Sequence, residues 1–274
     1  MAIQSSGQVT LNDIVTEFDG TAPHALSEYY GVDSGIPSSG QIRFSDFYGA
    51  TAITNYTLRS ASFNGSPINF LYLDRHTTPN GVFFKSDGTK MYVSESSGDR
   101  IYEYNLSTAW DVTTASYVQL SPSLIDINSS GMFFKPDGTK VYASGSFNDR
   151  IYEYDLSTAW DVTTIDTFNA SSFDVSGQDA NPTAVRFKSD GTKMYMLGYS
   201  TGGVYEYNLS TAWDVTTASY VQSFSVSSQD YTVFDVSFKS DGTKMYILGQ
   251  QFDSVYEYNL STAWDISTAS FAQS

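Results

Sequence analysis

The sequence contains no cysteine, and its 274 residues include only two histidines and 14 lysines and arginines. Without cysteine, the chain can form no disulfide, no thiolate nucleophile and no Cys-ligated zinc or iron–sulfur site. Against the 14 basic residues stand 30 aspartates and glutamates, which gives a formal net charge of −16. Nucleic acid and anionic membrane surfaces are bound by clustered Lys and Arg, so we expect neither as a partner.

The sequence also lacks targeting and membrane signals. Its opening, MAIQSSGQVTLNDIVTEF, has neither a basic region nor an apolar core and does not resemble a Sec signal peptide. No apolar run approaches the length of a membrane span. We therefore expect the chain to be made and kept in a cytoplasm, unless a route other than Sec exports it.

The strongest positive feature is a unit of about fifty residues that occurs four times. KSDGTKMYV and its close variants begin at Lys85, Lys135, Lys188 and Lys239, and each is followed by a copy of YEYNLSTAWDVTTA. The copies are separated by 50, 53 and 51 residues. A period of this size is typical of repeat architectures.

One unit divides into four short segments that favour strands, at 81–85, 90–94, 100–106 and 116–120. The Asp-Gly dipeptide between the first two segments is a strong hairpin signal. Four short antiparallel strands describe a β-propeller blade, and blades must stack because one sheet cannot bury both faces. The sequence predicts an all-β fold: a β-propeller of four four-stranded blades, preceded by a small N-terminal module of short helices and turns.

The repeat places a domain boundary just after residue 52. Residues 1–52 lack the repeat, and residues 55–274 carry it. Residues 55–63 resemble the fourth strand of a blade, whereas the last copy stops as its own fourth strand begins. We therefore expect 55–63 to complete the last blade and close the ring, which removes exposed sheet edges. Two alternatives stay open: a fragment with further blades missing, and an open, solenoid-like stack.

The repeat resembles a known group of propellers. The string PDGTK followed by VY, with a Tyr- and Val-rich strand after a polar loop, is similar to the repeats of YVTN and lactonase-like proteins. The resemblance covers all four copies. It implies the propeller fold and leaves the activity open, because that group includes enzymes, surface-layer proteins and binding proteins.

The first fifty residues resemble the leaders of tail- and fibre-associated structural proteins of tailed bacteriophages, especially phages of marine bacteria. The phrases that carry the resemblance are MAIQSSGQVTLNDIVTEF, ALSEYYG and SGQIRFSDFYGA. It implies that this module docks on a virion, and that a chain assembled in the host cytoplasm needs no signal peptide. The candidates for contacts with other virion proteins and with further copies of this chain are Leu11, Ile14, Phe18, Tyr29, Phe44 and Phe47.

Residues that recur in every copy are best explained by folding. Asp87 and its counterparts lie in Asp-Gly turns, and the alternating oxygen ligands of a calcium loop are absent. Glu103 and Lys90 are expected to pair across neighbouring strands. Trp110 and its three counterparts are interpreted as packing anchors, with sugar-stacking platforms as the alternative.

Binding residues are expected where the copies differ most, in the connections from the fourth strand of one blade to the first strand of the next. Loops of this kind lie on one face of a rigid scaffold and often bind ligands. The alternative is that they are only solvated connections. The candidates are Asp74, His76, Asp126, Asp179, Asn181, Asp230 and Tyr231.

Catalytic signatures are few. His24 and His76 lie in different regions, and the sequence has no Gly-x-Ser-x-Gly motif, no metal-ligand spacing and no phosphate-binding glycine loop. We therefore expect no catalytic residues, no metal and no cofactor. The prediction is a non-enzymatic structural protein of a tailed-phage virion, in the tail, fibre or collar, whose propeller faces outward and whose variable loops contact a host-surface glycan or a neighbouring virion protein. The alternatives are a bacterial propeller module that binds glycan or protein, and a metal-dependent lactonase-like hydrolase.

Overall fold

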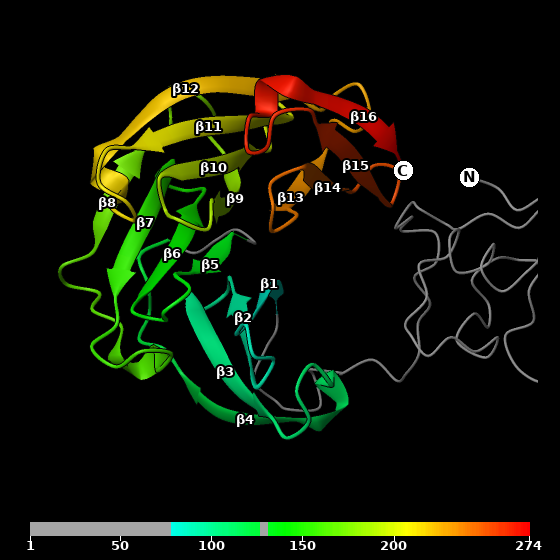
Figure 1. Ribbon diagram of the computed structural model, residues 1–274. Helices are drawn as coiled ribbons and strands as arrows, with labels where there is room; N and C mark the ends of the chain where they lie inside the picture. The colour runs from blue at the N-terminus through cyan, green and yellow to red at the C-terminus, as the bar shows by residue number, and fades with distance from the viewer. Residues whose placement is uncertain (1–77, 127–130) are drawn as a thin grey trace, which may run out of the picture. The chain divides into compact units, whose positions relative to one another are not determined.

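The computed structural model describes residues 78–126 and 131–274, all within Asn64–Ser274, the second of two compact units of the chain. These residues form four antiparallel sheets of four strands, arranged in chain order around a common centre (Figure 1). The predicted all-β fold and four-blade β-propeller are therefore confirmed. The predicted N-terminal module and its boundary lie outside the described residues, as do all six candidate assembly residues.

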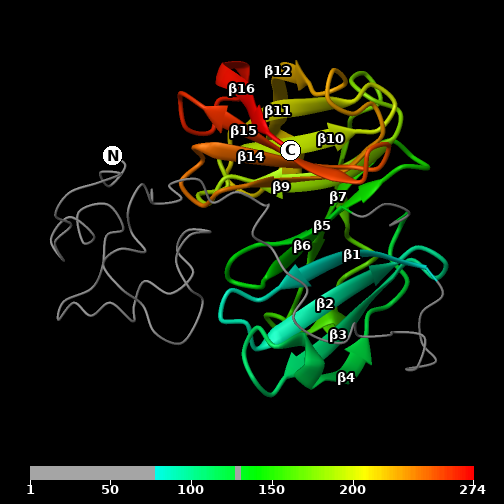
Figure 2. The same ribbon diagram turned by 90° about the vertical axis from the view of Figure 1, so that its right-hand side faces the viewer.

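Each repeat folds into one blade, with its strands side by side in chain order (Figure 2). The first strand lies nearest the centre and the fourth lies outermost (Figure 1). The strands predicted for the first unit agree with the structure to within two residues at each end. Blade 1 contains β1 (Pro79–Phe84), β2 (Lys90–Glu95), β3 (Arg100–Leu106) and β4 (Ala115–Leu120); blade 2 contains β5 (Met132–Phe134), β6 (Lys140–Gly145), β7 (Arg150–Asp155) and β8 (Ser171–Asp174); blade 3 contains β9 (Pro182–Phe187), β10 (Lys193–Gly198), β11 (Gly203–Leu209) and β12 (Ala218–Ser225); blade 4 contains β13 (Val233–Phe238), β14 (Lys244–Gly249), β15 (Ser254–Leu260) and β16 (Ala269–Gln273).

A short 3₁₀ helix, which the sequence did not predict, lies between the third and fourth strands of each blade. In blade 1, the carboxylate of Asp111 accepts a hydrogen bond from the backbone N–H of Thr113 and caps the helix. An aspartate plays the same part in the other blades. The helices are η5 (Val112–Thr114), η6 (Val162–Thr164), η7 (Val215–Thr217) and η8 (Ile266–Thr268).

The Asp-Gly segments form the turns that the sequence predicts. In blade 1, the backbone N–H of Gly88 donates to the carbonyl of Lys85 at 2.8 Å, and Gly88 has a φ of +71°, which favours glycine. The carboxylate of Asp87 accepts from the backbone N–H of Thr89 at 3.0 Å and pairs with the Lys85 ammonium. These interactions therefore account for the lysine, the aspartate, the glycine and the threonine of the KSDGT string.

The contribution of these turns to stability depends on pH, and this dependence can be measured at Asp190. The hydrogen bond from Lys188, followed by those from Thr192, lowers the pKa of Asp190 to about 2. An unfolded aspartate has a pKa of about 3.9. The folded pKa is the lower one, so the charged turn stabilises the fold above about pH 4, and this contribution is lost as the pH falls through 2.

We expect Asp190→Ser to be less stable than the parent protein at pH 6, and the two melting temperatures to converge near pH 2. The serine keeps an oxygen in the turn but removes the charge that Lys188 binds. Thermal unfolding followed by circular dichroism between pH 6 and pH 2 checks this. A difference in melting temperature that stays constant over that range would show that the charge of Asp190 contributes nothing.

Each tryptophan lies over the turn glycine of its own blade. A Cβ atom added to Gly138 would lie 2.4 Å from the indole ring of Trp160, so the ring occupies the space that only glycine leaves open. The same ring stacks with Phe134 at a centroid distance of 5.6 Å. Gly88, Gly191 and Gly242 stand in the same relation to their own tryptophans. These contacts support the interpretation of the tryptophans as packing anchors.

Consecutive blades pack face to face through apolar clusters. We call the face of a blade that meets the next blade its leading face, and the face that meets the previous blade its trailing face. Tyr92 and Ile101 on the leading face of blade 1 share a cluster with Phe134, Val141 and Tyr152 on the trailing face of blade 2. Equivalent clusters join blade 2 to blade 3 and blade 3 to blade 4. Apolar burial is the main force that favours this arrangement.

A tyrosine hydroxyl crosses each of these three interfaces. The acceptor is always the backbone carbonyl of the tryptophan in the next blade. Burial raises the pKa of these tyrosines, so their hydroxyls stay protonated and able to donate. The pairs are Tyr92 and Trp160 at 2.9 Å, Tyr142 and Trp213 at 2.7 Å, and Tyr195 and Trp264 at 2.6 Å.

A buried glutamate forms a second link between blades. The predicted Lys–Glu pair is confirmed in all four blades, and Lys90 reaches Glu103 diagonally because its direct partner in the sheet is Asn105. The other carboxylate oxygen, Oε2, accepts from a backbone N–H of the next blade. The three links run from Val162 to Glu103 at 3.4 Å, from Val215 to Glu153 at 2.8 Å, and from Ile266 to Glu206 at 3.3 Å.

Blade 4 has a fourth strand of its own. β16 pairs with β15, with Phe271 opposite Tyr258. Residues 55–63, predicted to complete this blade, lie outside the described residues, so their position remains a prediction. Across the ranges that the structure describes, no helix is long and apolar enough to span a membrane.

Candidate functional site

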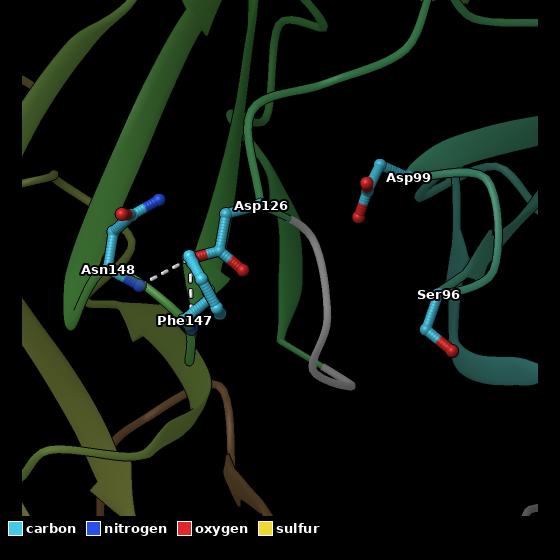
Figure 3. A pocket seen from close by; sticks show the side chains of 5 residues that line it. All are labelled: Ser96, Asp99, Asp126, Phe147 and Asn148. Carbon is cyan, nitrogen blue, oxygen red and sulfur yellow. Dashed lines mark hydrogen bonds between the residues drawn. The ribbon is translucent and has the colours of Figure 1, made fainter.

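An open pocket lies where the loops of blades 1 and 2 meet. Its volume is about 370 Å³, and it is lined by Ser96, Asp99, Asp126, Phe147 and Asn148 (Figure 3). The loop between β2 and β3 provides Ser96 and Asp99, and the equivalent loop between β6 and β7 provides Phe147 and Asn148. Asp126 belongs to the connection between the two blades. The pocket therefore combines residues that are up to 52 positions apart in the sequence, from Ser96 to Asn148.

Asp126 holds the loop of blade 2 in place. Its carboxylate oxygen Oδ2 accepts hydrogen bonds from the backbone N–H groups of Phe147 at 2.9 Å and Asn148 at 2.7 Å (Figure 3). Asp126 itself has a φ of 51°, a left-handed conformation that aspartate tolerates better than most residues. Its side chain therefore fixes the loop that presents Phe147.

Asp99 lies on the opposite wall of the pocket, in the loop of blade 1 (Figure 3). Its backbone carbonyl accepts from the N–H of Leu124 at 2.7 Å, which ties this loop to the connection that carries Asp126. Asp99 also has a left-handed φ, of 52°. The two carboxylates thus project from backbone segments that are hydrogen-bonded to their surroundings.

Phe147 is the apolar element of the pocket. Its side chain is 83% exposed, although burying a phenyl ring is worth about 1.5–3 kcal/mol. The neighbouring Asn148 adds a side-chain amide to the lining of the pocket. The pocket thus combines one apolar ring with two carboxylates, a hydroxyl and an amide.

This composition can bind a ligand that offers both C–H surface and hydroxyl donors. Carboxylate oxygens accept hydrogen bonds from hydroxyls, and an aromatic ring packs against an apolar face. Among the described residues, no group of three or more His, Cys, Asp or Glu side chains is placed to hold a metal ion.

The structure places the predicted binding residues in different environments. Asp126 lines the pocket. Asp179 and Asp230 are buried, and Tyr231 is 62% exposed beside Asp230. The backbone N–H of Asn181 donates to Asp179. Asp74 and His76 lie outside the described residues. Of the five candidates that the structure describes, only Asp126 lines the pocket.

The buried aspartates repeat the role of Asp126 in the later blades. Asp179 accepts from the backbone N–H and the hydroxyl of Thr201, at 2.8 and 2.7 Å. Asp230 accepts from the backbone N–H of Phe252 at 3.3 Å and from the hydroxyl of Tyr256. The three aspartates are 53 and 51 residues apart, the same spacing as the repeat itself. That spacing was a signal in the sequence that these residues stabilise the blades.

Sequence reasoning missed four of the five residues that line the pocket. It searched the connections between blades, whereas Ser96, Asp99, Phe147 and Asn148 lie in the loops within blades. The copies also differ there, reading SSGD, SFND, YSTG and QQFD. Variation in those loops was therefore a usable signal.

Comparisons with known proteins find similarities among solved structures. No protein-family model and no curated protein matches the chain. Among solved structures, it is similar to a candidate 6-phosphogluconolactonase from Bacteroides uniformis (14% identity, 69% of this chain, 54% of that chain, TM-score 0.44), to a protein from Lactobacillus plantarum (16%, 72%, 54%, 0.48) and to the periplasmic gluconolactonase of Pseudomonas aeruginosa (12%, 71%, 52%, 0.45). The chain spans about half the length of these structures. These comparisons do not show the resemblance to phage leaders.

The expectation that the chain is not an enzyme is corrected by these comparisons. Two of the similar structures carry the names of lactonases, which are enzymes. A propeller assembles its sites from residues that are distant in the sequence, as Asp99 and Asp126 illustrate, and a search for short motifs does not detect them. With TM-scores below 0.5, the likeness assigns no activity to the chain.

Proposed function

We propose that this chain is an attachment protein whose propeller binds a neutral carbohydrate in the pocket between blades 1 and 2. The observation that carries the proposal is the combination, in one pocket, of an exposed phenyl ring with carboxylate, hydroxyl and amide groups. A sugar has an apolar face of C–H groups and a rim of hydroxyls. It therefore matches both kinds of surface.

The charge of the chain favours a neutral ligand over an anionic one. The formal net charge is −16, and the pocket itself contains two carboxylates. A sulfated or uronic-acid sugar would approach against this field, whereas a neutral sugar would not.

The geometry of the loops supports binding by a preformed site. Asp126 fixes the backbone of Phe147 and Asn148, and the carbonyl of Asp99 is hydrogen-bonded to Leu124. A ligand that enters such a site loses less free energy to the ordering of loops. The phenyl ring is therefore presented before the ligand arrives.

The resemblance of residues 1–52 to phage leaders supports a place for this propeller on a virion. In this proposal the leader docks on other virion proteins and on its own copies, and the propeller faces the host surface. The carbohydrate is then a component of that surface.

We expect Phe147→Ala to weaken carbohydrate binding roughly tenfold or more, because burying a phenyl ring against a ligand is worth about 1.5–3 kcal/mol. An array of neutral bacterial-surface oligosaccharides identifies the ligand, and isothermal titration calorimetry with that oligosaccharide measures the loss. The melting temperature should not change, because the ring is exposed.

Phe252→Ala is the matched control. Phe252 is also exposed and lies in the equivalent loop of blade 4, away from the pocket. It should bind the oligosaccharide like the parent protein. The proposal is wrong if the array yields only anionic sugars or none, or if both variants bind as the parent does.

A further inference from the structure

The loops that form the carbohydrate pocket lie at one end of the blades. Neighbouring strands within a blade are antiparallel, so the loop between its second and third strands and the connection to the next blade leave from the same end. We call this end the loop end. It carries Tyr199, in the loop between β10 and β11, and Tyr231, in the connection between β12 and β13. Both side chains are exposed, Tyr199 by 36% and Tyr231 by 62%.

The two tyrosines approach the interface between blades 3 and 4 from different segments. The backbone N–H of Tyr199 donates to the carbonyl of Asn181 at 3.0 Å. Its ring packs edge-to-face on Phe234 of β13, with 5.8 Å between the ring centroids. Tyr231 lies three residues before Phe234 in the chain. One ring therefore reaches the interface from the loop of blade 3, and the other lies in the connection that enters blade 4.

Hydrogen bonds hold the backbone on both sides of Tyr231. The N–H of Asp230 donates to the carbonyl of Val226 at 3.1 Å, and the carboxylate of Asp230 accepts from the N–H of Thr232 at 2.8 Å. The carbonyl of Thr232 accepts from the N–H of Gln250, in the loop of blade 4, also at 2.8 Å. An exposed ring on a segment that is already ordered binds a ligand at a lower cost in free energy.

The fold of a blade does not require these two rings. The other blades carry short or polar side chains at the position of Tyr199 in the repeat, namely Ser96, Ser146 and Gln250. The counterpart of Tyr231 in the connection from blade 2 to blade 3 is Ala180. Ser96 lines the carbohydrate pocket. The repeat therefore places an aromatic ring, between blades 3 and 4, at the position that lines the pocket between blades 1 and 2.

We propose that Tyr199 and Tyr231 form a second carbohydrate subsite, and that the ligand is a neutral polysaccharide whose chain contacts both the pocket and this subsite. The inference rests on the proposed carbohydrate function. A phenol ring packs against the C–H face of a sugar unit, and its hydroxyl exchanges hydrogen bonds with sugar hydroxyls. The loop end presents both sites to the same side of the propeller.

The second subsite offers less to a short sugar than the pocket does. Asp179 and Asp230, the counterparts of Asp126, are buried, and their carboxylates accept backbone hydrogen bonds. The phenol rings therefore supply most of the contact. A polysaccharide that is bound in the pocket presents its other units at a high effective concentration, so a weak second contact raises the affinity. An oligosaccharide that fills only the pocket does not gain from it.

We expect Tyr231→Ala to weaken binding of the polysaccharide at least about tenfold and to change binding of the oligosaccharide less than about twofold. The probes are the oligosaccharide that the array identifies and the purified polysaccharide built from the same repeating unit. Isothermal titration calorimetry measures both. Phe147→Ala should weaken binding of both probes, because it removes the ring of the pocket. The melting temperature of Tyr231→Ala should equal that of the parent, because the side chain is exposed.

Phe168→Ala is the matched control, since Phe168 is 98% exposed and lies at the opposite end of the blades, between η6 and β8. It should bind both probes as the parent does. The second subsite is wrong if Tyr231→Ala binds the polysaccharide like the parent, or if it weakens both probes equally. A loss with Phe147→Ala in the same experiment would still support the pocket. Absence of binding to any neutral sugar would overturn the pocket and the second subsite together.

Discussion

Replacing Trp160 by alanine is expected to lower the free energy of unfolding by about 3–5 kcal/mol, the usual cost of removing a packed aromatic side chain. The indole stacks with Phe134, lies near Phe83 and Tyr92, and covers the face of Gly138. No neighbouring side chain can fill the space, because the residue beneath the ring is a glycine in a left-handed conformation. Urea unfolding followed by far-ultraviolet circular dichroism measures the loss.

Trp110→Ala is the matched control for this prediction. Trp110 covers its own turn glycine, but it is 58% exposed and its one neighbouring ring is Phe84, at 5.6 Å, within the described part of the chain. We expect less than half of the loss seen for Trp160→Ala. If the two variants lose the same stability, the contacts between blades are not what the tryptophan provides. Unchanged stability of Trp160→Ala together with lost oligosaccharide binding would support the sugar-stacking alternative instead.

The blades were predictable because every local signal is repeated four times. The Asp-Gly turn at Asp87 and Gly88 fixes the hairpin, and the alternation of Tyr102, Glu103 and Tyr104 fixes which side chains share a face. A repeated Lys and Glu on adjacent strands predicted their pairing. The 3₁₀ helices were missed, although Asp111 followed two residues later by Thr113 is a capping signal.

The pocket was not predictable to the same degree because it depends on contacts between blades. Asp126 and Phe147 are 21 residues apart. No local sequence pattern indicates that the carboxylate of Asp126 accepts a hydrogen bond from the backbone N–H of Phe147. Asp99 reaches the same pocket from the preceding repeat. The sequence predicted Asp126, Asp179 and Asp230 alike as binding residues. Asp179 and Asp230 are instead buried, and their carboxylates accept backbone hydrogen bonds within their own blades.

Identical sequence can also have different environments, which no local pattern reveals. Tyr195 and Tyr246 occupy the same position in the KMY string, yet only Tyr195 is fully buried and donates to a tryptophan carbonyl of the next blade. Glu206 and Glu257 are both buried, but of the two only Glu206 accepts a hydrogen bond from a backbone N–H of another described blade. Comparing variants at such equivalent positions therefore measures how much an interface between blades contributes to the free energy of unfolding.

Glu206→Ala is expected to lower the free energy of unfolding by about 2–4 kcal/mol. Glu206 is 1% exposed, pairs with Lys193, and accepts hydrogen bonds from Gln222 and from the backbone N–H of Ile266 in the next blade. Breaking a buried ion pair typically costs about 3–5 kcal/mol. The loss expected for Glu206→Ala is lower because the side chain of Lys193 reaches solvent. The buried N–H of Ile266 is left without an acceptor, which adds about 1–3 kcal/mol of desolvation.

Glu257→Ala removes the same carboxylate from blade 4, which is followed by no further blade among the described residues. Glu257 pairs with Lys244 and accepts from Gln273, but no backbone N–H of another blade donates to it within the described residues. We therefore expect a loss that is smaller by about 1–2 kcal/mol, measured by urea unfolding of both variants. Equal losses would mean that the glutamates stabilise only their own sheets and that the link between blades contributes nothing.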